Sequence, residues 1–216
     1  MTKPNKKKKG MLISFEGSEG SGKTTQVSRM ATFCEDSGYD VIVTREPGGT
    51  EIGEEIRHLL MHASSGSKMH PETELLLFAA SRAQLVREVI LPSLQKGNII
   101  LCDRFLDSTT VYQGVGRQIS REPVHIINTF AVGNIMPDIT IVVDVPAEIG
   151  LERIRHRVTD LPDRMEQENI EFYRKVREGY LLLAQAMPER FIVVDGIKPR
   201  GELADELWEK LKEYLP

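Results

Sequence analysis

The chain has 216 residues, of which 40% are hydrophobic and 28% charged, as is ordinary for a globular protein with a well-buried core. The whole chain carries a net charge of −4, and its first nine residues carry five lysines and no acid. The remainder therefore carries −9, which makes it a poor general binder of nucleic acid. No apolar run reaches the roughly 20 residues of a membrane helix, and no apolar segment follows the lysines as a secretory signal requires.

Residues 1–10 are expected to form a disordered basic tail, because a run of like charges is usually a solvated extension. Contact between this tail and nucleic acid is the less favoured alternative. Residues 11–216 are expected to form a single domain. Its two cysteines, Cys34 and Cys102, fall in an expected helix and an expected strand, so we expect free buried thiols in a reducing cytoplasm.

Strand-like and helix-like segments alternate along the chain, a pattern typical of a parallel sheet covered on both faces. We expect an α/β fold with three layers, a P-loop NTPase fold whose five-stranded parallel sheet is covered by helices on both faces, plus a short lid. The expected strands are 11–15, 39–44, 98–102, 139–143 and 191–194. The expected helices are 25–34, 51–61 with Thr50 as its cap, a long one beginning at Pro71, and 200–214.

A phosphate-binding loop is predicted between the first strand and the first helix. Its glycines let the backbone wrap closely around phosphates, with amide N–H groups pointing inward at a helix N-terminus. Lys23 would reach the β- and γ-phosphates, and the Thr24 hydroxyl would ligate Mg²⁺. A glycine-rich turn that only caps the helix is the structural alternative. The loop residues are Gly17, Ser18, Glu19, Gly20, Ser21, Gly22, Lys23 and Thr24.

The third strand ends in Asp103 and Arg104, at the edge where the phosphate loop is expected. A carboxylate in that crevice can hold Mg²⁺ or its waters, although it could equally cap the next segment. Arg104 makes sense there if a second phosphate group lies nearby. The predicted site therefore holds a nucleoside triphosphate with Mg²⁺, and Arg104 points to a second phosphate group beside it.

Five motifs then narrow the prediction, because together they closely resemble the thymidylate kinases in order and spacing. The resemblance covers essentially everything after the lysine tail and implies transfer of the ATP γ-phosphoryl group to dTMP, giving dTDP and ADP. It also implies a homodimer. The motifs are 44–50 (TREPGGT), 78–82 (FAASR), 103–114 (DRFLDSTTVYQG), 137–140 (PDIT) and 163–168 (DRMEQE).

The resemblance also implies residues for the acceptor. Arg57 and Arg104 would clamp its phosphate, while Phe78 would stack on thymine and Arg82, four residues later on the same helix, would donate to a base carbonyl. Tyr112 would lie under the sugar, where a ribonucleotide carries its extra hydroxyl. Further contacts are expected from Glu46, Pro47, Ser108, Thr109 and Gln113.

Three of these assignments have structural alternatives. Arg57 could be a surface arginine paired with Glu54 or Glu55 on its own helix. Phe78 could be an ordinary core residue. Glu46 could be a partner of Arg45 rather than an acidic group beside the acceptor.

A cluster of arginines falls at about 153–165, where nucleotide kinases carry a mobile lid. The variable positions of the phosphate loop, 18–21, contain no arginine, so the resemblance is to the bacterial-type branch, which supplies its catalytic arginine from the lid. Arg157 and Arg164 are the candidates, and Lys23 and Arg104 complete the predicted catalytic set. Glu19 would repel triphosphate oxygens and fits better if it points toward the acceptor sugar.

Other classes remain as alternatives. A regulatory GTPase would carry an N-K-x-D motif after the fourth strand, which this chain lacks. A nucleic-acid-driven ATPase would need further motifs and a less acidic body. Another small-molecule kinase of this fold, such as an adenylate, deoxynucleoside or shikimate kinase, is closer, and a pure ATP-binding module would show no turnover.

Overall fold

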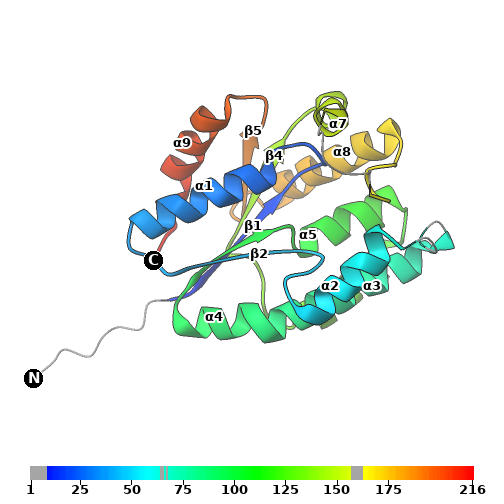
Figure 1. The fold of residues 1–216 in the computed structure, drawn as a ribbon, viewed down its shortest axis with the longest axis horizontal. Coiled ribbons are helices and arrows are strands. Elements are labelled where there is room, and N and C mark those ends of the chain that lie inside the picture. The colour runs from blue at the N-terminus through cyan, green and yellow to red at the C-terminus, as the bar shows by residue number, and fades with distance from the viewer. Residues whose placement is uncertain (1–8, 64–65, 67, 157–162) are drawn as a thin grey trace, which may run out of the picture.

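The computed structural model describes residues 9–63, 66, 68–156 and 163–216. Its centre is a five-stranded sheet in the order β2-β3-β1-β4-β5, with all neighbouring strands parallel (Figure 1). The five predicted strands are confirmed, with small changes at their ends. Their bounds are β1 Met11–Glu16, β2 Val41–Arg45, β3 Ile99–Asp103, β4 Ile139–Asp144 and β5 Phe191–Asp195.

Helices cover both faces of this sheet, as a parallel sheet requires (Figure 1). In the first half of the chain they are α1 Lys23–Asp36, α2 Glu51–Met61, α3 Pro71–Leu85, the π-helical stretch η2 Val86–Ile90, and α4 Leu91–Lys96. In the second half they are α5 Leu106–Thr109, the π-helical stretch η3 Thr110–Gly116, α6 Arg121–Val132, α7 Ala147–Arg155, α8 Ile170–Ala186 and α9 Arg200–Leu211.

Local residues explain where α2 and α3 begin. Thr50 accepts a hydrogen bond from the Gly53 amide at 3.0 Å, so it caps α2 as predicted. Pro71 stands at the first position of α3, where its missing N–H costs nothing. The predicted long helix from Pro71 continues through η2 and α4 as far as Lys96.

Successive side chains of a strand point to opposite faces of the sheet, so the core is divided into two sides. Ile13 and Phe15 of β1 face α1 and α9, where they pack among buried residues such as Met30 and Leu207. Leu12 faces the other side, where η2, α5 and α6 cover the sheet. Both cysteines are free and buried, as predicted. None of the helices within the described ranges is long and apolar enough to cross a membrane.

β1 is the central strand, flanked by β3 and β4, and the carboxyl ends of all three strands meet at one edge. The register pairs Phe15 of β1 with Asp103 of β3 and Arg45 of β2 with the same aspartate. In open α/β sheets this edge is where ligands bind. The fold thus brings the loop after β1 beside the polar residues that end β2 and β3.

Candidate active site

The phosphate loop connects β1 to α1 and lies against α7. Gly17, Gly20 and Gly22 have φ angles of 137°, 70° and 96°, a region that side chains rarely allow. A Cβ atom on Gly20 would lie 2.1 Å from the carbonyl oxygen of Gly150 in α7. Only glycine fits there, so the loop and α7 pack backbone to backbone.

Lys23 is held inside the loop that it follows. Its Nζ donates to the carbonyl oxygens of Gly17 at 3.0 Å and Ser18 at 2.8 Å, and to Ser21 Oγ at 3.3 Å. Burial and, to a smaller extent, the nearby positive charge of Arg104 lower the pKa of Lys23 to about 8. The ammonium group is therefore still mostly charged at neutral pH and is aimed at the concave side of the loop.

Thr24 and Asp103 lie together at the mouth of the loop. Thr24 Oγ1 donates to Asp103 Oδ2 at 2.6 Å, which joins the start of α1 to the end of β3. A hydroxyl and a carboxylate are the hard oxygen ligands that Mg²⁺ prefers, and Mg²⁺ commonly takes only one or two carboxylates beside substrate phosphates. No group of three or more metal-ligating His, Cys, Asp or Glu occurs in the part of the chain that the structure describes.

Arg104 connects the phosphate loop to the segment that follows β3. Its φ of 71° is left-handed, and its guanidinium donates to Gly17 O at 3.0 Å and forms an ion pair with Glu19 at 2.9 Å. The guanidinium also lies 5.0 Å from the centre of the Tyr112 ring. The Tyr112 hydroxyl donates to the second Glu19 oxygen. Glu19 thus points away from the concave side of its loop, toward Arg104 and Tyr112.

A fully buried carboxylate, Glu16, supports this cluster from below. Its oxygens accept hydrogen bonds from the Phe105 amide at 2.8 Å, Ser108 Oγ at 2.6 Å and the Tyr180 hydroxyl at 2.7 Å. Burial and, to a smaller extent, the negative charge of Asp107 raise its pKa to about 7. Glu16 therefore joins the end of β1 to α5 and α8.

A buried ion pair joins β2 to α3. Arg82 Nη2 lies 2.6 Å from Glu46 Oε2, and both side chains are at most 3% exposed. Arg82 Nη1 donates to Asn128, and Nη2 donates to Thr109 Oγ1 and to the Phe105 carbonyl oxygen. Burial raises the pKa of Glu46 to about 7, although Arg82 opposes the shift.

The alternative pairing of Glu46 with Arg45 is therefore wrong. Arg45 pairs instead with Glu54 at 2.9 Å, because Glu46 faces inward while Arg45 faces outward along β2. Glu46 Oε1 has no hydrogen-bond partner among the described residues, so an acceptor oxygen is left over inside the site. The peptide bond between Glu46 and Pro47 is cis.

Arg57 stands over the turn that follows β2. Its Nη1 donates to the Pro47 carbonyl oxygen at 3.1 Å, and Arg45 donates to the same oxygen at 3.0 Å. Among the described residues, Arg57 forms no ion pair with Glu54 or Glu55. Its pKa is lowered by burial and by the positive charges of Arg45 and Arg104. Arg45 and Arg57 thus meet at one carbonyl oxygen, and Arg104 is close enough to lower the pKa of Arg57; such a concentration of positive charge favours an anion.

The remaining acceptor-side residues come from α3 and from the segment Leu106–Gly116. Phe78 is partly buried and packs against the core cluster that includes Leu60, Tyr112 and Tyr173. Thr109 and Gln113 are each 1% exposed, and Gln113 donates to Glu74 Oε1 at 2.7 Å. The structure therefore brings Ser108, Thr109, Tyr112 and Gln113 together along one helical segment, and all four have hydrogen-bond partners.

The two candidate lid arginines differ. Arg157 lies outside the described residues. Arg164 pairs with the buried Glu74 at 2.6 Å and donates to the Leu60 carbonyl oxygen at 2.9 Å. Arg153, at the end of α7, donates to Gly20 O of the phosphate loop at 3.4 Å and to Gly196 O at 3.1 Å.

Sequence reasoning missed three residues that hold the site together: Glu16, Glu74 and Tyr180. Glu16 had a usable signal, since an acid ends an otherwise apolar strand immediately before the first loop glycine. Glu74 and Tyr180 lie on long helices among many polar neighbours, and their roles depend on partners that are distant in the sequence.

The sheet order, the phosphate loop at the end of its central strand and the oxygen pair beside the loop define a P-loop nucleotide-binding protein of the kinase type. The thymidylate kinase family model matches residues 15–207. The chain therefore belongs to the thymidylate kinase family and is a kinase.

Relatives and a solved structure agree with this membership. The chain is 51% identical over 202 residues to thymidylate kinase of Pelobacter propionicus, with 92% of each chain covered. It is 44% identical over 205 residues to thymidylate kinase of Kosmotoga olearia, with 95% of each covered. A crystal structure of thymidylate kinase from Ehrlichia chaffeensis superposes with a TM-score of 0.76 at 33% identity, covering 94% of this chain and 99% of that one.

The pKa of Lys23 gives a testable pH dependence. Because the free protein loses the Lys23 charge as pH rises through about 8, kcat/KM for ATP should fall about tenfold per pH unit above that value. The measurement is the initial rate at saturating dTMP and at ATP concentrations well below KM, from pH 6.5 to 9.5, with circular dichroism at each pH as the control for folding. A profile that stays flat in a folded protein would contradict the assignment.

Proposed function

We propose that this chain uses one two-sided site to transfer the γ-phosphoryl group of ATP in line to dTMP, giving dTDP and ADP for dTTP synthesis. The observation that carries the proposal is the position of Arg104. Its guanidinium contacts the phosphate loop at Gly17 O and Glu19 and lies over the ring of Tyr112. A cation at this junction can neutralise charge on both the donor and the acceptor phosphates.

On the donor side, the loop amides and Lys23 bind the ATP phosphates. Thr24 and Asp103 hold Mg²⁺, which neutralises charge on the triphosphate when bound. Their direct hydrogen bond at 2.6 Å supports this role, since it keeps both oxygens at the mouth of the loop. The loop residues in contact with ATP are Gly17, Ser18, Glu19, Gly20, Ser21, Gly22, Lys23 and Thr24.

On the acceptor side, Arg57 and Arg104 hold the dTMP phosphate. Arg57 and Arg45 both donate to the Pro47 carbonyl oxygen. Burial and the positive charges of Arg45 and Arg104 lower the pKa of Arg57, so an anion bound beside Arg57 would relieve the repulsion between these charges. A phosphate acceptor is already anionic and nucleophilic, so the reaction requires alignment and charge neutralisation rather than a strong general base.

The base and sugar of dTMP are bound by residues that lie beyond Arg57 and Arg104. Phe78 stacks on thymine and Arg82 donates to a base carbonyl. The Arg82 guanidinium has five N–H groups, and protein acceptors already take four of them: the one at Nε, one at Nη1 and both at Nη2. The second N–H at Nη1 is left to donate to the base. Tyr112 packs under the sugar. Glu46, Pro47, Ser108, Thr109 and Gln113 complete the pocket.

Closure of a lid at about 153–165 brings a further cation to the transferred group. Arg157 and Arg164 remain the proposed donors of that charge. The bond between Arg153 and Gly20 O supports a lid hinged on α7, because it ties the end of this helix to the phosphate loop. Arg164 would have to leave Glu74 to reach the loop, which favours Arg157.

The decisive experiment is ATP-dependent turnover with a panel of nucleoside monophosphates. We expect dTMP to exceed AMP, CMP and GMP in kcat/KM by at least about 10²-fold, because unmatched hydrogen-bonding groups in the base pocket are costly. Equal rates with AMP or CMP would assign the chain to another small-molecule kinase. Absence of ADP release with every acceptor would reduce it to an ATP-binding module.

We also propose a homodimer in the cytoplasm. The free thiols of Cys34 and Cys102 are consistent with a reducing compartment. The dimer is supported by exposed apolar side chains on three helices that pack in succession, α2, α3 and α6. These side chains are Ile52, Leu59, Leu76, Ile126 and Phe130, and the last is 81% exposed.

Phe130→Asp should therefore convert the protein to a monomer, because an unpaired charge at the centre of an apolar interface opposes association. The measurement is light scattering coupled to size-exclusion chromatography. Ile197→Asp is the matched control, since Ile197 is 52% exposed but lies in the turn after β5. A monomeric wild-type protein, or a dimeric Phe130→Asp variant, would refute this interface.

A further inference from the structure

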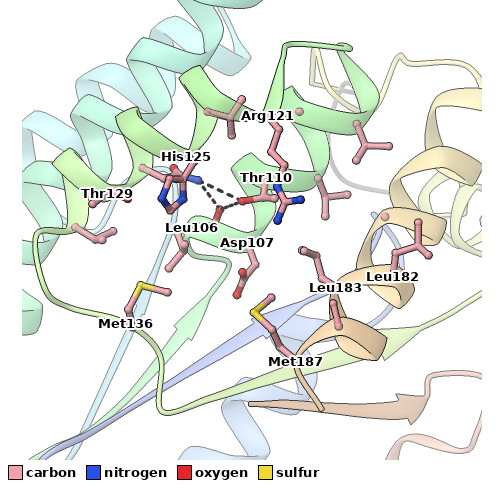
Figure 2. A pocket seen from close by; sticks show the side chains of 18 of the residues that line it. Leu106, Asp107, Thr110, Arg121, His125, Thr129, Met136, Leu182, Leu183 and Met187 are labelled. Carbon is pink, nitrogen blue, oxygen red and sulfur yellow. Dashed lines mark hydrogen bonds between the residues drawn. The ribbon is translucent and has the colours of Figure 1, made fainter. Parts of the chain in front are cut away.

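A large cavity lies behind the segment that carries Ser108 and Tyr112, on the side away from the phosphate loop. It has a volume of about 630 Å³ and is enclosed by the segment Leu106–Gly116, α6 and the second half of α8 (Figure 2). This volume lies within the range of small-molecule sites. None of the residues assigned to ATP or dTMP above lines it.

The wall of this cavity is aliphatic. Its apolar side chains include Val111, Val124, Leu183, Met136 and Met187, and no Phe, Tyr or Trp side chain lines it. Figure 2 shows the two methionine side chains, which come from opposite sides of its lower part. A wall without Phe, Tyr or Trp rings offers little stacking surface to a flat base, while flexible thioethers adapt to an alkyl chain.

The polar residues of the cavity favour an anion. Arg121 and His125 stand one turn apart on α6 and are exposed, and neither forms an ion pair within the described residues. Asp107 is the one acidic residue of the lining. It is already bound by both terminal nitrogens of Arg190, at 2.7 and 2.9 Å, and by Thr140. Arg121 therefore has no competing carboxylate in the wall.

We propose that this cavity is a binding site for a free alkyl carboxylate of about eight to twelve carbons. The alkyl chain would lie between α6 and α8, and the carboxylate would accept hydrogen bonds from the Arg121 guanidinium at the mouth. Figure 2 shows Arg121 extending from α6 alongside Thr110. Guanidinium and carboxylate form a charge-assisted pair, which fixes which end of the ligand faces out.

Occupancy of this site alters the affinity for dTMP. Val111 and Gly114 line the cavity, while Tyr112 and Gln113 between them face the acceptor side. One helical segment thus separates the two sites, and a ligand that displaces one side of it moves the other. This coupling rests on the proposed function, whereas the binding site itself does not. Linkage requires that dTMP change the affinity for the alkyl carboxylate by the same factor.

The test is a titration of the full chain with sodium decanoate, kept below its micelle concentration and followed by the methyl NMR signals of methionine. The chain has eight methionines, and Met136 and Met187 are assigned by substitution with leucine. We expect these two signals to shift with a roughly millimolar or tighter Kd, and saturating dTMP to change that Kd at least about twofold.

Three variants test the contacts. Arg121→Gln should raise the Kd about tenfold, while Arg29→Gln, an exposed arginine on α1, should leave it unchanged. Ala186→Trp should abolish the shifts by filling the cavity from the exposed end of α8. Neutral decanamide should bind at least about tenfold more weakly than decanoate.

Several outcomes overturn the proposal. Absence of shifts at Met136 and Met187, equal shifts at all methionines, or equal Kd values for wild type and Arg121→Gln would each remove the site. If a second copy of the chain covered the cavity, Met136 and Met187 would likewise show no shifts. A Kd unaffected by dTMP would remove the coupling alone. Failure of dTMP in the acceptor panel would remove the proposed function and leave the binding site standing.

Discussion

The buried carboxylate of Glu16 is the constraint on which the rest of the site depends. It ends the central strand immediately before the phosphate loop, and it accepts hydrogen bonds from the Phe105 amide, Ser108 and Tyr180. One side chain therefore fixes the relative positions of the phosphate loop, the start of α5 and the inner face of α8. Burial without a direct ion pair is costly for a carboxylate, and its pKa of about 7 reflects that cost.

Above Glu16, charge is arranged in a way that favours two phosphate groups. Lys23 and Arg104 repel each other enough to help lower the pKa of Lys23, and Arg104 likewise lowers the pKa of Arg57. The positive charge of Arg104 thus disfavours the charged forms of Lys23 and Arg57, and a phosphate bound beside them would relieve that repulsion. Glu19 offsets part of this repulsion by pairing with Arg104 at 2.9 Å.

The sequence alone predicts the sheet, its parallel strands and the phosphate loop, because apolar strands and glycine spacing are local signals. The helix ends at Thr50 and Pro71 were predictable for the same reason. The pairing of Arg82 with Glu46 was not, since 36 residues separate the partners and only the fold brings them together. The three hydrogen bonds of Glu16 span 89 to 164 residues, which no local pattern reveals.

The most direct measurement is the kcat of Glu16→Gln beside its melting temperature. The amide keeps the volume but cannot accept all three hydrogen bonds, so Arg104 and Ser108 lose their fixed positions. The account predicts a fall in kcat of about 10- to 100-fold, because small misplacements of aligned phosphates are expensive. It also predicts an unchanged or higher melting temperature above pH 7, since a buried ionised group has been removed. A folded Glu16→Gln variant with wild-type kcat would contradict the account.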